Sequence, residues 1–300
     1  MIDDSVLDQP ELLARLDPGH MFAAVASSGA QMREAVRDAD SAALAAIADG
    51  GKPRAIIVAG MGGSGVSGDV LTAVTGPSSS IPIVVERTHH LPGWVSPLDM
   101  VIAVSCSGST EETLSVAEEA GRRGARLVTI GARDSQLHSI SRSVSGAIHL
   151  AIDAKGRMPR ASLWTIATPL LMVANALGVA QITDQDFAVT ADLMDQVSVE
   201  CGIPVPVEQN PAKLLGIALA ESVPMLWGTG AIGRAVTGRF MAQLAENAKM
   251  PAIYGGLPEV GHNQIVTFDG PLAPRASDIF DDPIDAPRGR MLHLSLIHIS

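Results

Sequence analysis

The sequence predicts an α/β protein in which parallel sheets are covered by helices on both faces. Short apolar runs alternate with helical patterns from about residue 51 onward, which is typical of strands buried on two sides. A glycine-rich turn joins an apolar run to a helix at Gly60–Gly65, and a similar turn recurs at Gly228–Gly233. This recurrence predicts two copies of one doubly wound α/β unit, preceded by N-terminal helices.

The first copy follows from apolar runs bounded by turn residues. Its expected strands are 55–59, 81–85, 100–104, 126–130 and 147–150. The helices expected before, between and after them start at Pro10 or span 32–48, 66–74, 111–123, 160–177 and 183–201. Pro169 is expected either to kink the helix over 160–177 or to split it.

The second copy has fewer elements. We expect strands over 222–227 and 252–254, with a helix over 234–249 between them. These are too few to complete a sheet like the first, and Met291–Ser300 is apolar without a clear amphipathic pattern. The domains are therefore expected at 1–48 (helical), 49–182 and 183–300, the last incomplete, with a C-terminal part that is truncated or not native.

Composition limits the function classes. The chain has 300 residues, of which 47% are hydrophobic, and a formal net charge of −11, which argues against nucleic-acid and anionic-membrane partners. Two cysteines, Cys106 and Cys201, fit a reducing cytoplasm better than a disulfide framework. The N-terminus lacks the pattern of a signal peptide, and no apolar run is long enough to span a membrane.

A hydroxyl-rich turn at Ser105–Thr110 connects an expected strand to an expected helix. Unpaired backbone N–H groups and the helix dipole favour an anion at such a place, and Ser64 adds a hydroxyl at the helix after the glycine turn. Because parallel strands end at one edge of a sheet, the two turns should converge on one phosphate group. Its expected ligands are Gly63, Ser64, Ser105, Ser107 and Thr110. The alternative is that these hydroxyls are ordinary turn and N-cap groups.

The glycine turn also fits a dinucleotide-binding fingerprint. Gly60–Gly65 has the spacing, and Glu86 follows a strand at the distance expected of a ribose-binding carboxylate. A nicotinamide-dependent oxidoreductase is therefore an alternative, but it gives no reason for the hydroxyl turn. A third interpretation is that the glycines serve only tight strand-to-helix packing.

Five motifs in order resemble the bifunctional phosphoglucose/phosphomannose isomerases, which are built from two sugar isomerase (SIS) domains. They are GMGGSG, SCSGSTEET, MPRAS, AENAK and PEVGHN, within Gly51–Phe268. The resemblance implies two flavodoxin-like sandwiches and an isomerase that converts glucose 6-phosphate and mannose 6-phosphate to fructose 6-phosphate. It also implies no metal, no cofactor, and a homodimer with active sites shared between subunits.

The resemblance supplies three catalytic residues for proton transfer between C1 and C2 of the open-chain sugar. Glu246 would be the base, His262 would open the ring from the second subunit, and Arg160 would stabilise the enediolate. The alternatives are a solvated carboxylate or a partner of Lys249, a surface loop histidine, and a surface ion pair. Glu221 and Glu259 are weaker rivals for the base.

Two further observations qualify this assignment. His89 and His90 are adjacent, and their side chains diverge without a carboxylate or cysteine cluster nearby, so we expect loop residues and not metal ligands. The resemblance also implies a substrate-binding lysine near the C-terminus, but no lysine follows Lys249. A non-catalytic SIS module that senses a sugar phosphate therefore remains an alternative to the enzyme.

Overall fold

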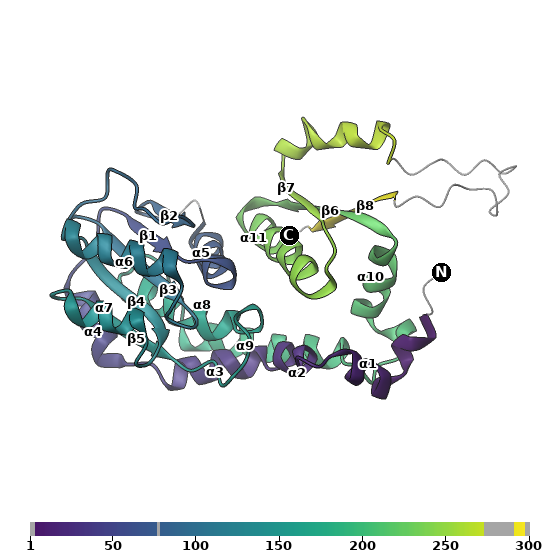
Figure 1. Cartoon of the computed structure of the whole chain (residues 1–300), viewed down its shortest axis with the longest axis horizontal. Coiled ribbons are helices and arrows are strands. Elements are labelled where there is room, and N and C mark those ends of the chain that lie inside the picture. Colours follow the sequence, from purple (N-terminus) through teal and green to yellow (C-terminus); the bar gives the residue numbers. More distant parts are fainter. Residues whose placement is uncertain (1–3, 77–78, 273–290, 298–300) are drawn as a thin grey trace, which may run out of the picture. The chain divides into compact units, whose positions relative to one another are not determined.

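The computed structural model describes residues 4–76, 79–272 and 291–297 (Figure 1). The chain divides into two compact units. The first unit is Asp17–Val199, and the second unit combines Met1–Leu16 with Glu200–Ser300. The domain limits expected from the sequence remain predictions.

The first unit contains one five-stranded parallel sheet, as the sequence predicts. Its spatial order is β2-β1-β3-β4-β5. The strands are β1 (Ile56–Ala59), β2 (Ile83–Glu86), β3 (Met100–Ser105), β4 (Arg126–Ala132) and β5 (Ile148–Ile152). The order reverses between β1 and β3, which makes this a doubly wound, flavodoxin-like arrangement and confirms the predicted fold class.

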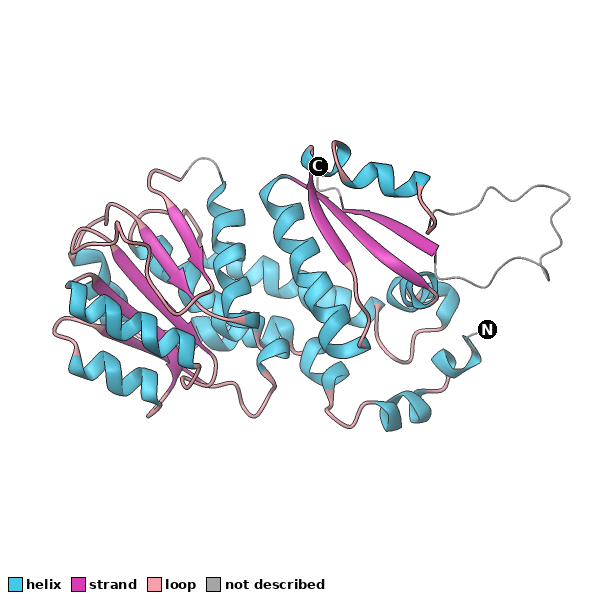
Figure 2. Ribbon diagram, turned by 45° about the horizontal axis from the view of Figure 1, so that its top comes forward, coloured by secondary structure: helices cyan, strands magenta, loops and turns pink. Residues whose placement is uncertain are grey.

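Helices cover this sheet on both faces (Figure 2). α6 (Glu111–Arg123) and α7 (Gln136–Ser143) pack on one face, and α5 (Gly62–Thr75) and α8 (Leu163–Ala176) on the other. Alternate residues of each strand point to opposite faces, so Val58 and Ile102 join the core under α8, whereas Ile57 and Val101 join the core under α6. Both β1 and β3 are buried throughout, because both faces are covered.

The remaining helices of this unit correct one expectation and rule out one of two alternatives for another. The stretch 32–48 is not one helix but belongs to α3 (Ser28–Arg37) and α4 (Ser41–Asp49), because the Asp40 carboxylate accepts a hydrogen bond from Ala43 N (2.9 Å) and starts a new helix. Pro169 lies inside α8 without splitting it. The other two helices are α2 (Met21–Ala26) and α9 (Asp184–Glu200).

The second unit holds a three-stranded parallel sheet in the order β7-β6-β8. β6 is Ser222–Thr229, β7 is Ile253–Leu257 and β8 is Met291–Ile297. The sequence did not predict β8, although its leucines alternate with His293 and Ser295. The helical segments of this unit are η1 (Asp4–Asp8), α1 (Pro10–Leu16), η4 (Val207–Gln209), α10 (Pro211–Ala220), α11 (Gly230–Gln243), η5 (Leu244–Ala248), η6 (Glu259–Gly261) and η7 (Gln264–Asp269).

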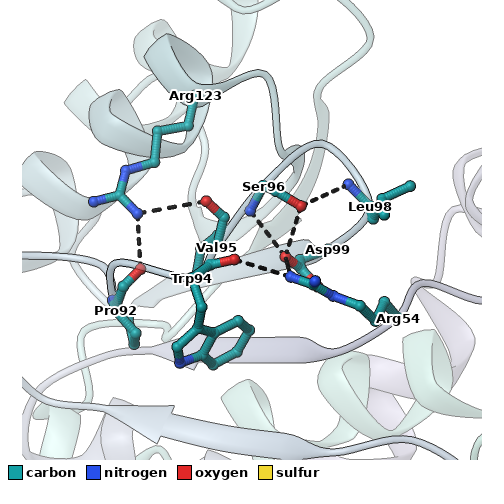
Figure 3. A network of polar contacts seen from close by, with 8 residues as sticks. All are labelled: Arg54, Pro92, Trp94, Val95, Ser96, Leu98, Asp99 and Arg123. Atoms are coloured by element: carbon teal, nitrogen blue, oxygen red, sulfur yellow. Dashed lines mark hydrogen bonds and ion pairs between the residues drawn. The ribbon is translucent and has the colours of Figure 1, made fainter.

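A polar network fixes the connection between β2 and β3 in the first unit (Figure 3). Arg54 donates to both carboxylate oxygens of Asp99 (2.9 and 2.7 Å) and to Trp94 O (2.9 Å). Ser96 donates to Asp99 through its backbone N (2.8 Å) and its hydroxyl (3.2 Å). Asp99 is fully buried, and these bonds, above all that from Arg54, hold the pKa of its carboxyl below its usual value.

No helix in the part of the chain that the structure describes is long and apolar enough to cross a membrane.

Candidate active site

The glycine turn (Gly60–Gly65) and the hydroxyl turn (Ser105–Thr110) meet at the C-terminal edge of the first sheet. They follow the adjacent strands β1 and β3, between which the strand order reverses. A hydrogen bond joins the turns directly, because Cys106 N donates to Ser64 Oγ (3.3 Å). This edge is where doubly wound sheets bind their ligands.

The glycine turn requires its glycines. A Cβ on Gly65 would lie 2.6 Å from Gly60 O, and Gly62 has a φ of +50°. The tight turn places Gly63 and Ser64 in the first turn of α5, where both are buried. Ser64 Oγ accepts the bond from Cys106, so its own hydrogen is free to be donated to a second group.

The hydroxyl turn is held together by its own side chains. Ser105 is fully buried, and its Oγ lies 2.8 Å from Thr110 Oγ1 and accepts a bond from Gly108 N (3.0 Å). Ser107 is exposed, and its Oγ accepts a bond from Ser109 Oγ (2.9 Å). Ser105 is thus placed to shape the turn, whereas Ser107 presents its hydroxyl at the surface.

The two helices that start at these turns lack side-chain caps. Neither the side chain of Met61 before α5 nor that of Thr110 before α6 accepts a hydrogen bond from its own helix. The neighbouring α7 is capped, because Ser135 Oγ accepts from His138 N (3.3 Å). Uncapped helix starts leave backbone N–H groups available to an anion.

Arg160 lies in the same unit, within the short 3-10 helix η3 (Pro159–Ala161), which packs against α5. We call Met158–Ser162 the Arg160 turn. Its last residue, Ser162, lies near the Cys106 thiol of the hydroxyl turn. Burial raises the pKa of that thiol, and the nearby Ser162 hydroxyl and the charge of Arg157 oppose the shift. The Arg160 turn therefore lies near the hydroxyl turn.

Glu246 lies in the second unit, in the π-helical segment η5 that continues α11. Its side chain is half-buried. Lys249 Nζ donates to the backbone oxygen of Glu246 (2.6 Å) and not to its carboxylate. Arg239 on α11 is the positive charge that the carboxylate meets, since the Glu246 charge raises the pKa of Arg239 against a larger lowering by burial. π-Helical turns within α-helices occur frequently at functional sites.

His262 follows η6 in the second unit and is exposed. Its backbone N donates to Glu259 O (2.9 Å), which closes the short helix. The Glu259 carboxylate accepts a bond from Asn263 Nδ2 (2.8 Å), so this rival base is engaged within its own loop. The side chain of His262 thus lies at the surface of the loop.

The residues considered for a metal or a dinucleotide have local contacts of other kinds. The His89 and His90 rings lie 6.4 Å apart, and no group of three or more potential metal ligands occurs among the described residues. Glu86 Oε1 accepts a bond from Arg87 N (3.0 Å). Arg87 in turn donates to Gly65 O (3.2 Å), which ties the end of β2 to the glycine turn.

Sequence analysis did not single out a polar group beside β5. A cavity of about 210 Å³ there is lined by side chains that include Gln31, Arg133, His138, His149 and Thr165. The His138 and His149 rings stack 4.3 Å apart. Gln31 is buried on α3, and a polar residue between apolar neighbours on a buried helix face was the signal that could have found it.

Comparison with protein families decides the relationship. Residues 52–180 match the model of the SIS domain, and residues 208–293 match the model of the bacterial phospho-glucose isomerase C-terminal SIS domain. Both models describe SIS domains, so the chain contains two regions similar to SIS domains. The first match contains the two turns and Arg160, and the second contains Glu246 and His262.

Two related proteins show which enzymes the chain is similar to. A bifunctional phosphoglucose/phosphomannose isomerase of Caldicellulosiruptor bescii is 31% identical over 72% of this chain, and the chain spans 63% of that relative's length. A D-glucosamine-6-phosphate 4-epimerase of Sulfolobus acidocaldarius is 26% identical over 80% of this chain and 72% of its own length. The resemblance to the bifunctional isomerases drawn from the five motifs is thereby confirmed.

Solved structures support the SIS fold. The C-terminal domain of glucosamine-fructose-6-phosphate aminotransferase from Francisella tularensis aligns with a TM-score of 0.61 and 14% identity. The alignment covers 84% of this chain and 73% of that one. At this identity the likeness establishes the architecture alone.

Proposed function

We propose that the protein is an aldose–ketose isomerase that interconverts glucose 6-phosphate and mannose 6-phosphate with fructose 6-phosphate. The observation that carries the proposal is the order of the two matched regions. A region that matches the SIS domain comes first, and a region that matches the C-terminal SIS domain of bacterial phospho-glucose isomerases follows. A bifunctional isomerase relative also matches over 216 residues of the chain.

In this proposal the first unit holds the substrate. Ser64, Ser107 and Thr110, with the backbone N–H of Gly63, bind the phosphate, while Ser105 holds the hydroxyl turn in shape. The uncapped starts of α5 and α6 support this assignment. Hydrogen bonds and helix dipoles bind the phosphate, because the hydroxyl turn contains no basic residue.

The second unit supplies the chemistry. His262 donates a proton to the ring oxygen as its bond to C1 breaks and takes up the proton that the C1 hydroxyl loses, which opens the sugar. Glu246 then removes the proton from C2 of the open-chain aldose. The hydroxyl proton moves from O2 to O1 while the proton on Glu246 returns to C1, which yields the ketose with no net change in atoms. Arg160 stabilises the negative charge of the enediolate between these steps, and its permanent charge suits that task.

We propose a homodimer in the cytoplasm as the working form. The exposed position of His262 supports its delivery to the active site of a second subunit. The free thiols of Cys106 and Cys201 fit a reducing compartment. Mixing a Glu246 variant with a His262 variant tests the shared site, because the mixture should regain part of the activity that each variant lacks.

The direct test is a coupled assay with both aldose phosphates. We expect turnover of both in the unmodified protein and a loss of about a thousandfold in Glu246→Gln, since positioned general bases typically contribute 10²- to 10⁴-fold. Fructose 6-phosphate should still bind to Glu246→Gln with unchanged affinity in calorimetry. Turnover retained in Glu246→Gln would refute the base assignment.

The same purified proteins test two alternative functions. A sugar-phosphate sensor would bind fructose 6-phosphate with no turnover, and its affinity would not depend on Glu246 or His262. Glucosamine 6-phosphate is included as a third substrate because the relative from Sulfolobus acidocaldarius bears the name of an epimerase for it. Epimerisation of the amino sugar without isomerisation of glucose 6-phosphate would replace the proposed function.

A further inference from the structure

Gln31 is a buried amide that connects the N-terminal helices to the candidate site. It lies on α3 with 1% of its surface exposed. α3 precedes both regions that match family models, which start at residues 52 and 208. The contacts of Gln31 therefore link a part of the chain without an assigned role to the SIS domain.

The amide of Gln31 is fully used. Its Nε2 donates to Ala161 O (2.8 Å), and it also lies 3.2 Å from Ala24 O and from Ser27 Oγ. Its Oε1 accepts from Thr165 N (3.4 Å) and from Thr165 Oγ1 (3.2 Å). Gln31 thus forms hydrogen bonds with Ala161, the residue directly after Arg160, and with Thr165, four residues later.

These bonds replace a missing helix cap. The Ser162 side chain, at the N-cap of α8, does not accept a bond from its helix, and its Oγ instead donates back to Met158 O (3.0 Å). Thr165 is the third residue of α8, and its N–H is a group that an N-cap would normally satisfy. Gln31 Oε1 provides the acceptor from another helix, and the same amide fixes Ala161 O within the Arg160 turn.

We infer that Gln31 is a positioning residue that holds Arg160 at the angle needed to stabilise the enediolate. The inference rests on the proposed function for its catalytic consequence. Gln31 does not touch the phosphate-binding turns, so it should act on the chemical step and leave phosphate binding intact. Ser162, the last residue of the Arg160 turn, lies near Cys106 of the hydroxyl turn.

The test compares Gln31→Met with a matched control, Ser96→Ala. Ser96 also makes part-buried polar bonds in the first unit (Figure 3), but it precedes β3 and so lies toward the N-terminal edge of the sheet. Gln31→Met should lower kcat about tenfold to a hundredfold with KM for fructose 6-phosphate changed by less than about twofold, since small misplacements of a catalytic group cost this much. Ser96→Ala should leave both constants within about twofold.

A double-mutant cycle separates positioning from general destabilisation. If Gln31 acts through Arg160, adding Gln31→Met to Arg160→Met should change kcat by less than about twofold. If the two losses multiply, Gln31 does not act through Arg160 and the inference is overturned.

A measurement that does not depend on catalysis tests the role of Gln31 separately from the proposed function. Hydrogen–deuterium exchange should become at least about tenfold faster at residues 160–165 in Gln31→Met and stay unchanged at residues 105–110, because of these two segments only the former bonds to Gln31. Unchanged exchange at 160–165 overturns the inference even in a protein that shows no turnover. If Gln31→Met does not fold, Thr165→Val removes one of the bonds to Oε1, and the same pattern is expected with a smaller size.

Discussion

Gly60–Gly65 and Gly228–Gly233 build the same strand-to-helix turn in the two units, yet their surroundings differ. In each, a Cβ on the last glycine would meet the backbone of the first, at 2.6 Å for Gly65 and 2.9 Å for Gly233. In each, the third residue has a positive φ, +50° in Gly62 and +64° in Gly230. The glycine spacing therefore encodes a backbone shape that the two units share.

The residue before the last glycine separates the two turns. Ser64 is buried and bonded to the hydroxyl turn on the adjacent strand, whereas Ile232 is 45% exposed. Beside β6, the strand β7 ends at Leu257 and Pro258, which carry no hydroxyl. Glycine spacing thus indicates the turn, and the hydroxyls on the neighbouring strand indicate what the turn binds.

The largest expected effect tests the shared backbone. Gly65→Ala and Gly233→Ala should each lower the free energy of unfolding by about 3 kcal/mol, because the new methyl group overlaps backbone atoms that cannot move aside cheaply. Chemical denaturation followed by tryptophan fluorescence measures this. Gly93→Ala, where no atom lies within 4 Å of the new Cβ, is the control and should change stability by less than about 0.5 kcal/mol. A mild effect in only one of the two turns would break the comparison.

The next expected effect is a loss of stability at low pH, and it arises in the first unit. His149 is largely buried beside His138, its Nε2 has no hydrogen-bond partner among the described residues, and burial lowers its pKa to about 4 from 6.5. The folded state therefore disfavours the protonated form. The free energy of unfolding is highest above pH 6.5, where His149 is neutral in both states. It falls by about 2 to 3 kcal/mol as the pH drops from 6.5 to 4, since His149 takes up a proton in the unfolded chain before it does so in the folded one.

The variant His149→Gln checks this sign. It removes the titrating group, so the free energy of unfolding should depend less on pH between 4 and 6.5, although the variant is less stable near pH 7. Urea unfolding at a series of pH values gives both curves. Parallel curves for the two proteins would mean that another group controls the acid response.

Sequence reasoning located the strands well because apolar runs between turn residues report burial on two faces. The bounds of α6 match the prediction of 111–123, since an acidic start and a basic end mark this helix. The start of α5 was placed late, at Val66, because the glycines of its first turn carry no apolar pattern. The split of α3 from α4 needed the capping role of Asp40 to be recognised.

The candidate site shows the same division. The two turns could be predicted from sequence because each is a contiguous motif with its own physical signature. The bond from Cys106 N to Ser64 Oγ joins residues 42 positions apart, and the grip of Gln31 on Ala161 joins residues 130 apart. Such pairs depend on how helices pack, and no local pattern encodes them.

The next expected effect concerns ligand binding. Ser64→Ala should weaken binding of fructose 6-phosphate about tenfold, or about 1.4 kcal/mol, because one donor to the phosphate is lost. The matched change in the other turn, Ile232→Ser, adds a hydroxyl at the same position of the motif and should change the affinity by less than about twofold. Calorimetric titration measures both. Equal losses in the two variants would show that the turns do not differ in function.

The smallest expected effect isolates the positive φ of the third glycine. Gly62→Ala and Gly230→Ala meet no atom within 4 Å, so only the left-handed backbone opposes them, at a cost of about 1 kcal/mol each. Gly216→Ala in α10 also meets no atom but has ordinary helical geometry, so it should raise the free energy of unfolding by up to about 1 kcal/mol. If thermal unfolding shows that the first two variants are less stable and Gly216→Ala is more stable, the cost at Gly62 and Gly230 comes from the left-handed backbone conformation. A stabilising Gly62→Ala would show that α5 does not need a left-handed residue where it leaves the glycine turn, and the likeness of the two turns would then be one of spacing alone.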